Sequence, residues 1–178
     1  SFGAACGPKN SQSSPGTTGS GVIKTDSRNI VGFKMIRAES AIDLAVSVTN
    51  GYSVIVKADD NIVADVITKL DGDTLVISLK DKTNSKSKIS VSVTMPAIEG
   101  VDLTGATNAT VTGVKADELT VSATGAAKAK LDGVAKVLKI KALGASEVDA
   151  EGLTANKAEV DAVGASKIIV SATDELTA

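Results

Sequence analysis

Apolar and polar residues alternate strictly in the second half of the chain, and this alternation predicts β-strands. In residues 119–124 the apolar positions hold Leu, Val and Ala, and the positions between them hold Thr, Ser and Thr. The pattern returns at residues 138–142 and 158–162. Because successive side chains of a strand point to opposite faces, these apolar positions are expected to share one buried face. No segment here has the 3.6-residue period that a helical repeat requires.

Glycines divide these strands into repeats of 19 or 20 residues. Gly-Ala pairs are separated by intervals of 20, 19 and 20 residues, and a second set of glycines by intervals of 20 and 19. A period near 20 with turn residues and alternating strands indicates a β-solenoid of stacked coils, with glycines supplying positive φ at the corners. The pairs begin at Gly105, Gly125, Gly144 and Gly164, and the second set is Gly113, Gly133 and Gly152.

The outward charges support this register. Stacking by one period places Lys128 beside Glu147, Glu147 beside Lys167, and Lys130 beside Asp149. Each pair contributes about 0.2–1 kcal/mol at a solvated surface, and its main effect is to specify register. We therefore interpret these five residues as structural, and the alternative is that they form an exposed binding face. Similar neighbours are Lys139 with Glu159 and Lys141 with Asp161.

The first half is also strand-like, but its spacing is less regular. Residues 42–48 alternate and lead to a turn at Asn50-Gly51. Residues 59–61 are expected to start a short helical turn over residues 62–69. We predict one solenoid domain over residues 19–178, with less regular coils in 19–97 and regular coils in 98–178.

The first 18 residues have a different character. Residues 7–21 are rich in Ser, Gly, Thr and Pro, which predicts a flexible tether. The preceding residues 1–6 resemble the end of a bacterial lipoprotein signal, in which Cys6 becomes the acylated first residue, although Gly3 stands where such signals prefer Leu. The alternative is a cysteine without a role. We assign residues 1–18 to the remnant of an export signal and the tether.

Composition excludes several classes of chemistry. The chain has no histidine, one cysteine and three aromatic residues among 178. Catalytic triads, Cys-His dyads and intrachain disulfides are therefore excluded, and so are the usual zinc sites. A net charge of −2 with only two arginines argues against nucleic-acid binding. No apolar run of about 18 residues is present, and we expect no cofactor.

Several short motifs, in their order along the chain, resemble the putative auto-transporter adhesins with a head GIN domain. The motifs are residues 28–36, 42–48, 50–51, 59–61, 72–77 and 95–96, followed by the Gly-Ala repeats. The resemblance spans residues 19–178. It implies an all-β, right-handed parallel β-helix, export to the bacterial envelope and often a lipid anchor. It carries no catalytic residues.

We therefore expect a non-enzymatic envelope module that presents its surface to a glycan or protein, held at the membrane only by a lipid anchor. One alternative is a polysaccharide-processing enzyme, for which either the three carboxylates of residues 59–65 or the two of residues 71–73 could gather a weak cation. Turn chemistry explains four of them better. A second alternative is a scaffold that self-associates into homo-oligomers, because the pattern stops within a repeat. The five carboxylates are Asp59, Asp60, Asp65, Asp71 and Asp73.

Overall fold

A computed structural model describes residues 16–80, 83–85 and 87–178 of the chain. Cys6 and the rest of the expected signal remnant lie outside the described residues. The expectation of an all-β fold is confirmed, because strands make up nearly all regular structure in the described part. The strands are β1 (Thr17–Thr18), β2 (Ile23–Arg28), β3 (Met35–Glu39), β4 (Ile42–Val48), β5 (Ser53–Asp59), β6 (Val66–Asp71), β7 (Thr74–Leu79), β8 (Thr83–Asn84), β9 (Ile89–Met95), β10 (Gly100–Gly105), β11 (Asn108–Gly125), β12 (Lys128–Gly144), β13 (Glu147–Gly164) and β14 (Lys167–Thr177).

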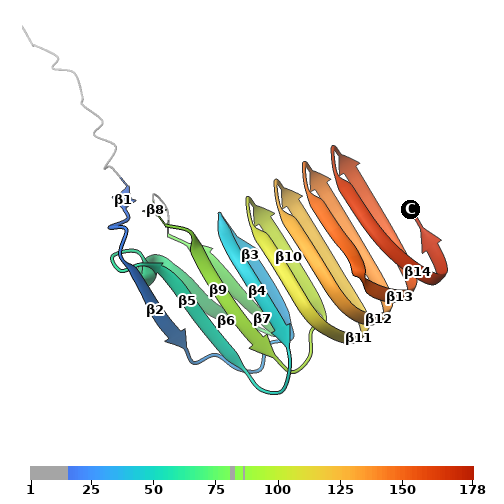
Figure 1. Ribbon diagram of the computed structural model, residues 1–178, viewed down its shortest axis with the longest axis horizontal. Helices are drawn as coiled ribbons and strands as arrows, with labels where there is room; N and C mark the ends of the chain where they lie inside the picture. The colour runs from blue at the N-terminus through green and yellow to red at the C-terminus, as the bar shows by residue number, and fades with distance from the viewer. Residues whose placement is uncertain (1–15, 81–82, 86) are drawn as a thin grey trace, which may run out of the picture.

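The strands form two rows with the core between them. The first row runs β6–β7–β3–β10 and continues into the C-terminal halves of β11 to β14. The second row runs β2–β5–β9–β4 and continues into the N-terminal halves of the same four strands. Each long strand therefore belongs to both rows, and Figure 1 shows β11 to β14 side by side at the end of the molecule away from β2.

The predicted repeat agrees with the observed pairing of the long strands. Leu119 lies beside Leu138, and Leu138 lies beside Ala158, in parallel register. The Gly-Ala glycines also align, and Gly125 and Gly144 have φ of +89° and +84°. A Cβ on Gly144 would come 2.9 Å from the carbonyl oxygen of Gly125. This column therefore requires glycine both for its backbone conformation and for the close approach of successive strands.

The second set of glycines does not form the predicted column. Gly133 pairs with Val114, and Gly152 pairs with Asp132. The cause is a shift of register between Val111 and Val114, and another between Lys130 and Asp132. Moreover, Gly152 is not among the glycines with positive φ. Bulges of this kind change the number of residues per repeat without changing the face that a strand buries.

The predicted inward positions form the core of the repeats. Leu119, Val121 and Ala123 are fully buried, as are Leu138 and Ala142. Hydroxyl side chains also enter the core beside the Gly-Ala turns, where a buried polar group needs a hydrogen bond. The Oγ of Ser146 donates to the carbonyl oxygens of Ala123 (2.9 Å) and Leu143 (2.6 Å).

Burial weakens at the last strand of the repeats. Val160 is only partly buried, and Ala162 is exposed, contrary to expectation. Both lie on β13 beyond Glu159, the last residue of this strand that pairs with β14, so in the described pairings they have β12 on one side only. Their inward side chains therefore lack the second neighbour that buries Ala142 one repeat earlier.

The first half departs from the predicted coils. Asn50-Gly51 does form a turn, with Gly51 at φ +99°, but β4 and β5 do not pair with each other. Instead β9 lies between them, parallel to β4 and antiparallel to β5. The expected helical turn over residues 62–69 is shorter, a 3-10 turn at Val63–Asp65, because β6 begins at Val66 and pairs antiparallel with β7.

Candidate binding surface

The predicted charge ladder lies on the outer side of the second row. Lys128 of β12, Glu147 of β13 and Lys167 of β14 are neighbours in register. The Nζ of Lys128 lies 3.4 Å from Glu147 Oε2, and the Nζ of Lys167 lies 3.3 Å from Glu147 Oε1. Glu147 thus links three strands, as the repeat predicts. Whether these residues bind a ligand stays a prediction.

Two neighbouring lysines of the ladder favour the ionised form of the Glu147 carboxyl group. Hydrogen bonds from Lys167 and then from Lys128 lower the pKa of its carboxyl group, and the positive charges of both lysines add to this effect. The side chain is partly exposed, so water and salt screen these interactions. Glu147 is therefore ionised at neutral pH and alternates with positive charge across three strands.

The ladder borders a shallow hollow of about 270 Å³. Lys130 and Asp149 are register neighbours in this hollow, next to the Glu147 ladder. Asp149 accepts a hydrogen bond at Oδ1 from the backbone N–H of Glu151 (3.0 Å). The hollow thus offers ammonium groups, carboxylates and amide groups on a sheet surface. The lining residues are Asn108, Ala109, Thr110, Lys128, Ala129, Lys130, Glu147 and Asp149.

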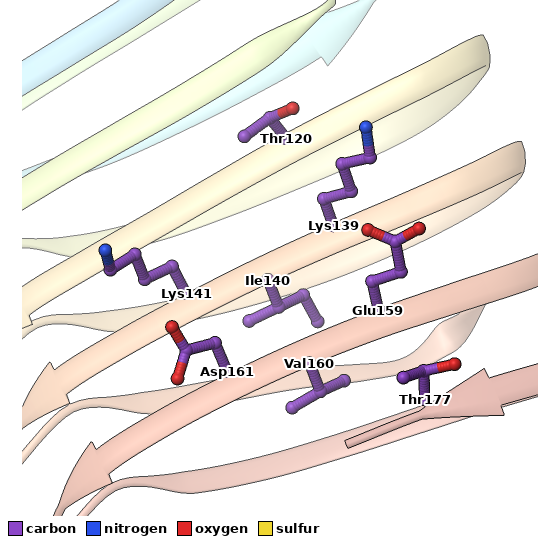
Figure 2. A pocket seen from close by; sticks show the side chains of 8 residues that line it. All are labelled: Thr120, Lys139, Ile140, Lys141, Glu159, Val160, Asp161 and Thr177. Atoms are coloured by element: carbon purple, nitrogen blue, oxygen red, sulfur yellow. The ribbon is translucent and has the colours of Figure 1, made fainter.

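A second hollow, of about 290 Å³, lies on the outer side of the first row. Figure 2 shows Lys139 and Lys141 on one strand, with Glu159 and Asp161 on the next. Both pairs are in the predicted register. However, the Nζ of Lys139 lies 3.2 Å from Glu118 Oε2, on the preceding strand. The register neighbours of Lys139 are Thr120 and Glu159, so this flexible lysine reaches diagonally to an acid that the register does not place directly beside it.

The two hollows have the same arrangement of charge. In each, two lysines separated by one residue on β12 lie beside two acids separated by one residue on β13. Sequence analysis identified all eight residues as register neighbours, but it named only the ladder of the second row as a candidate face. The signal for the other hollow was available: Lys-X-Lys recurs in β12, and acid-X-acid follows it 19 or 20 residues later.

The acidic residues considered for a cation site have structural contacts. Asp60 accepts a hydrogen bond from the Ser20 hydroxyl, and Asp65 Oδ1 lies 3.2 Å from the Nζ of Lys80. Asp59 is buried and accepts a hydrogen bond from Ser85 (2.9 Å). Asp71 and Asp73 adjoin the hairpin turn between β6 and β7. Within the described ranges, no three His, Cys, Asp or Glu side chains gather in a way that could hold a metal ion.

The described residues contain no helix long and apolar enough to cross a membrane.

No curated protein matches the chain. Solved structures share its fold. A putative adhesin from Bacteroides fragilis is 20% identical, with a TM-score of 0.75, and the match covers 90% of this chain and 85% of that one.

Two further structures have lower scores. A putative adhesin from Parabacteroides merdae is 17% identical, with a TM-score of 0.61, over 91% of this chain and 99% of that one. A putative lipid binding protein from Parabacteroides distasonis is 13% identical, with a TM-score of 0.56, over 91% and 99%. At these identities the likeness concerns the fold alone. The family model described as "Putative auto-transporter adhesin, head GIN domain" matches residues 32–178, so the chain belongs to this family.

Proposed function

We propose that this protein is a non-enzymatic binding module of the bacterial cell envelope. The observation that carries the proposal is the pair of matching charged hollows on opposite outer faces of the repeats. Membership of an adhesin family is consistent with it. Both surfaces are broad and shallow, which suits adhesion to an extended glycan or protein surface better than enclosure of a small substrate.

The charges define how such a surface would bind. Each exposed lysine or carboxylate contributes little alone, because water screens it. Several such contacts acting together would make attachment depend on the number of contacts and decrease as salt is added. Binding through these hollows is therefore weak per molecule, strengthened by many copies on one cell, and sensitive to ionic strength.

Two finer features belong to the same proposal. We infer that the chain winds as a right-handed parallel β-helix, which the parallel register of 19 or 20 residues between successive long strands supports. We also propose export with a lipid on Cys6, which rests on the resemblance of residues 1–6 to a lipoprotein signal. Mass spectrometry of the protein expressed in bacteria with its natural leader tests for the lipid. An unmodified Cys6 thiol in the mature protein would contradict the anchor.

The binding proposal is tested with purified protein on an array of bacterial and host glycans and matrix proteins, and then on beads that carry many copies. The variant Lys128→Gln/Lys130→Gln removes the basic side of one hollow. The matched control, Lys24→Gln/Lys57→Gln, removes the same charge from exposed positions on β2 and β5.

We expect the beads to attach to at least one array component, and we expect attachment to decrease in the first variant but not in the control. Raising the salt from about 0.05 M to about 0.5 M should also reduce attachment. Folded protein that attaches to nothing would overturn the adhesion proposal. Equal attachment by the two variants would show that the hollow beside the charge ladder does not take part in adhesion.

A further inference from the structure

The sheet has an internal gap beside the bend of β11, where this strand passes from one row to the other. Residues 108–112 of β11 pair with β4, and residues 120–125 pair with β10. Between them, residues 114–116 and Glu118 pair with β12 on one side. Among the pairings of the described residues, no strand lies on their other side. The bend of β11 is therefore an open strand edge in the middle of the molecule.

The path of the chain explains the gap. A regular coil would continue from β4 through the bend into β10. Instead the chain leaves β4 after Val48, forms β5 to β9, and reaches β10 from Met95. Both ends of the gap are closed: a Cβ on Gly113 would lie 2.9 Å from the Val48 carbonyl oxygen, and the N–H of Thr120 donates to the Glu99 carbonyl oxygen (3.0 Å). Between these points, residues 114–118 span about 16 Å when extended, the length of one short strand.

A groove of about 520 Å³ adjoins this edge. It has apolar side chains from Met35, Ile98 and Ala116, of which Ile98 is fully buried. Around these lie three carboxylates and one lysine. The lining residues are Met35, Ala97, Ile98, Glu99, Lys115, Ala116, Asp117, Glu118 and Thr120. The groove is thus lined by both apolar and acidic side chains.

The exposed backbone of β11 determines which kind of molecule can bind in the groove. Thr120 directs its N–H to this side of β11, and among the pairings of the described residues no strand takes up residues 114–118 here, so the bend presents a strand edge without a strand partner. A row of backbone donors and acceptors at strand spacing is matched by another extended peptide. Sugar hydroxyl groups do not have this spacing along a chain. The geometry therefore favours a polypeptide over a glycan as the occupant.

At the same bend, the pairing of β11 with β12 shows which side chains a neighbouring strand places beside β11. There β11 pairs with Val134 and Ala135 of β12, and Ala135 is fully buried. The Nζ of Lys136 lies 2.6 Å from Asp117 Oδ1. A small apolar side chain thus points inward while a lysine pairs with an acid outside. The open side offers apolar groups from Met35 and Ala116, with Glu99 and Glu118 beside them. These two acids lie 3.5 Å from the Nζ of Lys34 and 3.2 Å from the Nζ of Lys139, and such exposed pairs are weak enough for a basic residue of a ligand to compete for the acids.

We propose that the bend of β11 binds an extended segment of another polypeptide as an added β-strand. The segment is about five residues long and combines apolar residues with at least one basic residue. The groove shares only Thr120 with the hollow of Figure 2. Glu118 of the groove also pairs with Lys139 of that hollow (3.2 Å), so the two sites adjoin, but strand addition is a different mode of binding from adhesion through the charged hollows.

The test uses the whole 178-residue chain and a synthetic peptide, Gly-Val-Ala-Lys-Val-Leu-Lys, with blocked ends. This is the sequence of residues 133–139, which pairs with the other side of the bend. Binding is followed by calorimetry, and a scrambled peptide of equal composition is the control. We expect the native sequence to bind at least about tenfold more tightly, with slower amide exchange within residues 114–118.

Two peptides with N-methyl groups identify the mode of binding without altering the protein. One carries the methyl groups on alternate residues, and the other carries them on the remaining residues. Since only one edge of an added strand faces β11, one peptide should lose about tenfold or more in affinity and the other should keep it. Equal affinities for the two peptides would overturn strand addition.

A protein variant tests the location. Ala97 is exposed and lines the groove, so Ala97→Trp should fill it and reduce affinity about tenfold, while circular dichroism shows that the fold is kept. Leu70→Trp, at an exposed position of β6 away from the groove, is the control and should bind as the unchanged protein does. Undiminished binding by folded Ala97→Trp would overturn the proposed site.

Discussion

The first half of the sheet and the repeats enclose cores of different size. Up to Met95, two of the nineteen buried hydrophobic residues of the described chain are alanines, and Phe33 is fully buried there. After Gly105, nine of the eighteen are alanines. Phe33 also contacts Tyr52 edge to face, with ring centroids 5.0 Å apart. Because protein cores are close-packed, we expect the two rows to lie closer together where alanines fill the core than where larger side chains do.

This difference shows that strands with the same alternation of apolar and polar residues can form a buried core through two different kinds of strand pairing. In the repeats, stacking in constant register places like residues over like, and alanine and glycine permit the close approach. In the first half, β9 inserts between β4 and β5 in mixed directions. Fewer positions there are equivalent, so each large side chain has its own surroundings. The two regions should therefore respond to opposite kinds of substitution.

Truncation of the large ring in the first half should have the largest effect. Phe33→Ala removes a fully buried aromatic side chain, and we expect a loss of about 3–5 kcal/mol in the free energy of unfolding. Phe33→Leu, which keeps most of the volume, should cost distinctly less. Chemical denaturation of the three proteins measures this. A loss below about 1 kcal/mol for Phe33→Ala would show that large side chains are not what stabilises this region.

Enlargement should be harmful in the repeats. Ala142→Leu forces three extra carbon atoms into a fully buried position between the rows, and we expect a cost of about 1–3 kcal/mol. Ala162 occupies the same register position one repeat later but is exposed. Ala162→Leu should therefore leave the denaturation midpoint nearly unchanged. If the two leucine variants had equal midpoints, the close approach of the rows would not limit side-chain size.

Glycine substitution separates backbone strain from crowding. Gly144→Ala combines positive φ with a Cβ 2.9 Å from the Gly125 oxygen. Gly51→Ala, in the first half, has positive φ but nothing within 4 Å of the new Cβ. Both variants place an alanine at positive φ and are destabilised by backbone strain. We expect Gly144→Ala to be less stable than Gly51→Ala by about 1–2 kcal/mol in the same denaturation experiment. Equal losses would mean that the glycine column needs only the backbone conformation.

The charge ladder should produce the smallest effect, visible as a dependence on pH. The lysines lower the pKa of Glu147 in the folded protein, so the stabilisation is complete above the pKa of an unfolded glutamate, about 4.3. It is lost as the pH falls through the lower folded value. Glu147→Gln should therefore show a slightly shallower loss of thermal stability below about pH 4.3. Glu39→Gln, at an exposed site of the first half, is the control. Identical pH profiles for Glu147→Gln and the unchanged protein would exclude a net contribution from the ladder.

Several features followed from local pattern alone. Alternation identified the buried faces of residues 119–123 and 138–142, and the glycine period identified their parallel register. The same period placed Lys128 and Lys167 on either side of Glu147. These inferences succeeded because the direction of a side chain on a strand is a local property, and because repetition reduces the choice of neighbours to the adjacent repeat.

Other features depended on how distant parts of the chain meet. The turn at Asn50-Gly51 was visible in the sequence, but the insertion of β9 between β4 and β5 was not. Nor could alternation locate the bulge that shifts Gly152 away from Gly133, or decide that Lys139 reaches Glu118 rather than Glu159. Strand order, bulges and the open edge at the bend of β11 result from competition among many strand pairings of similar energy. Only the folded arrangement of the whole chain decides that competition, because each pairing depends on which edges the others have already occupied.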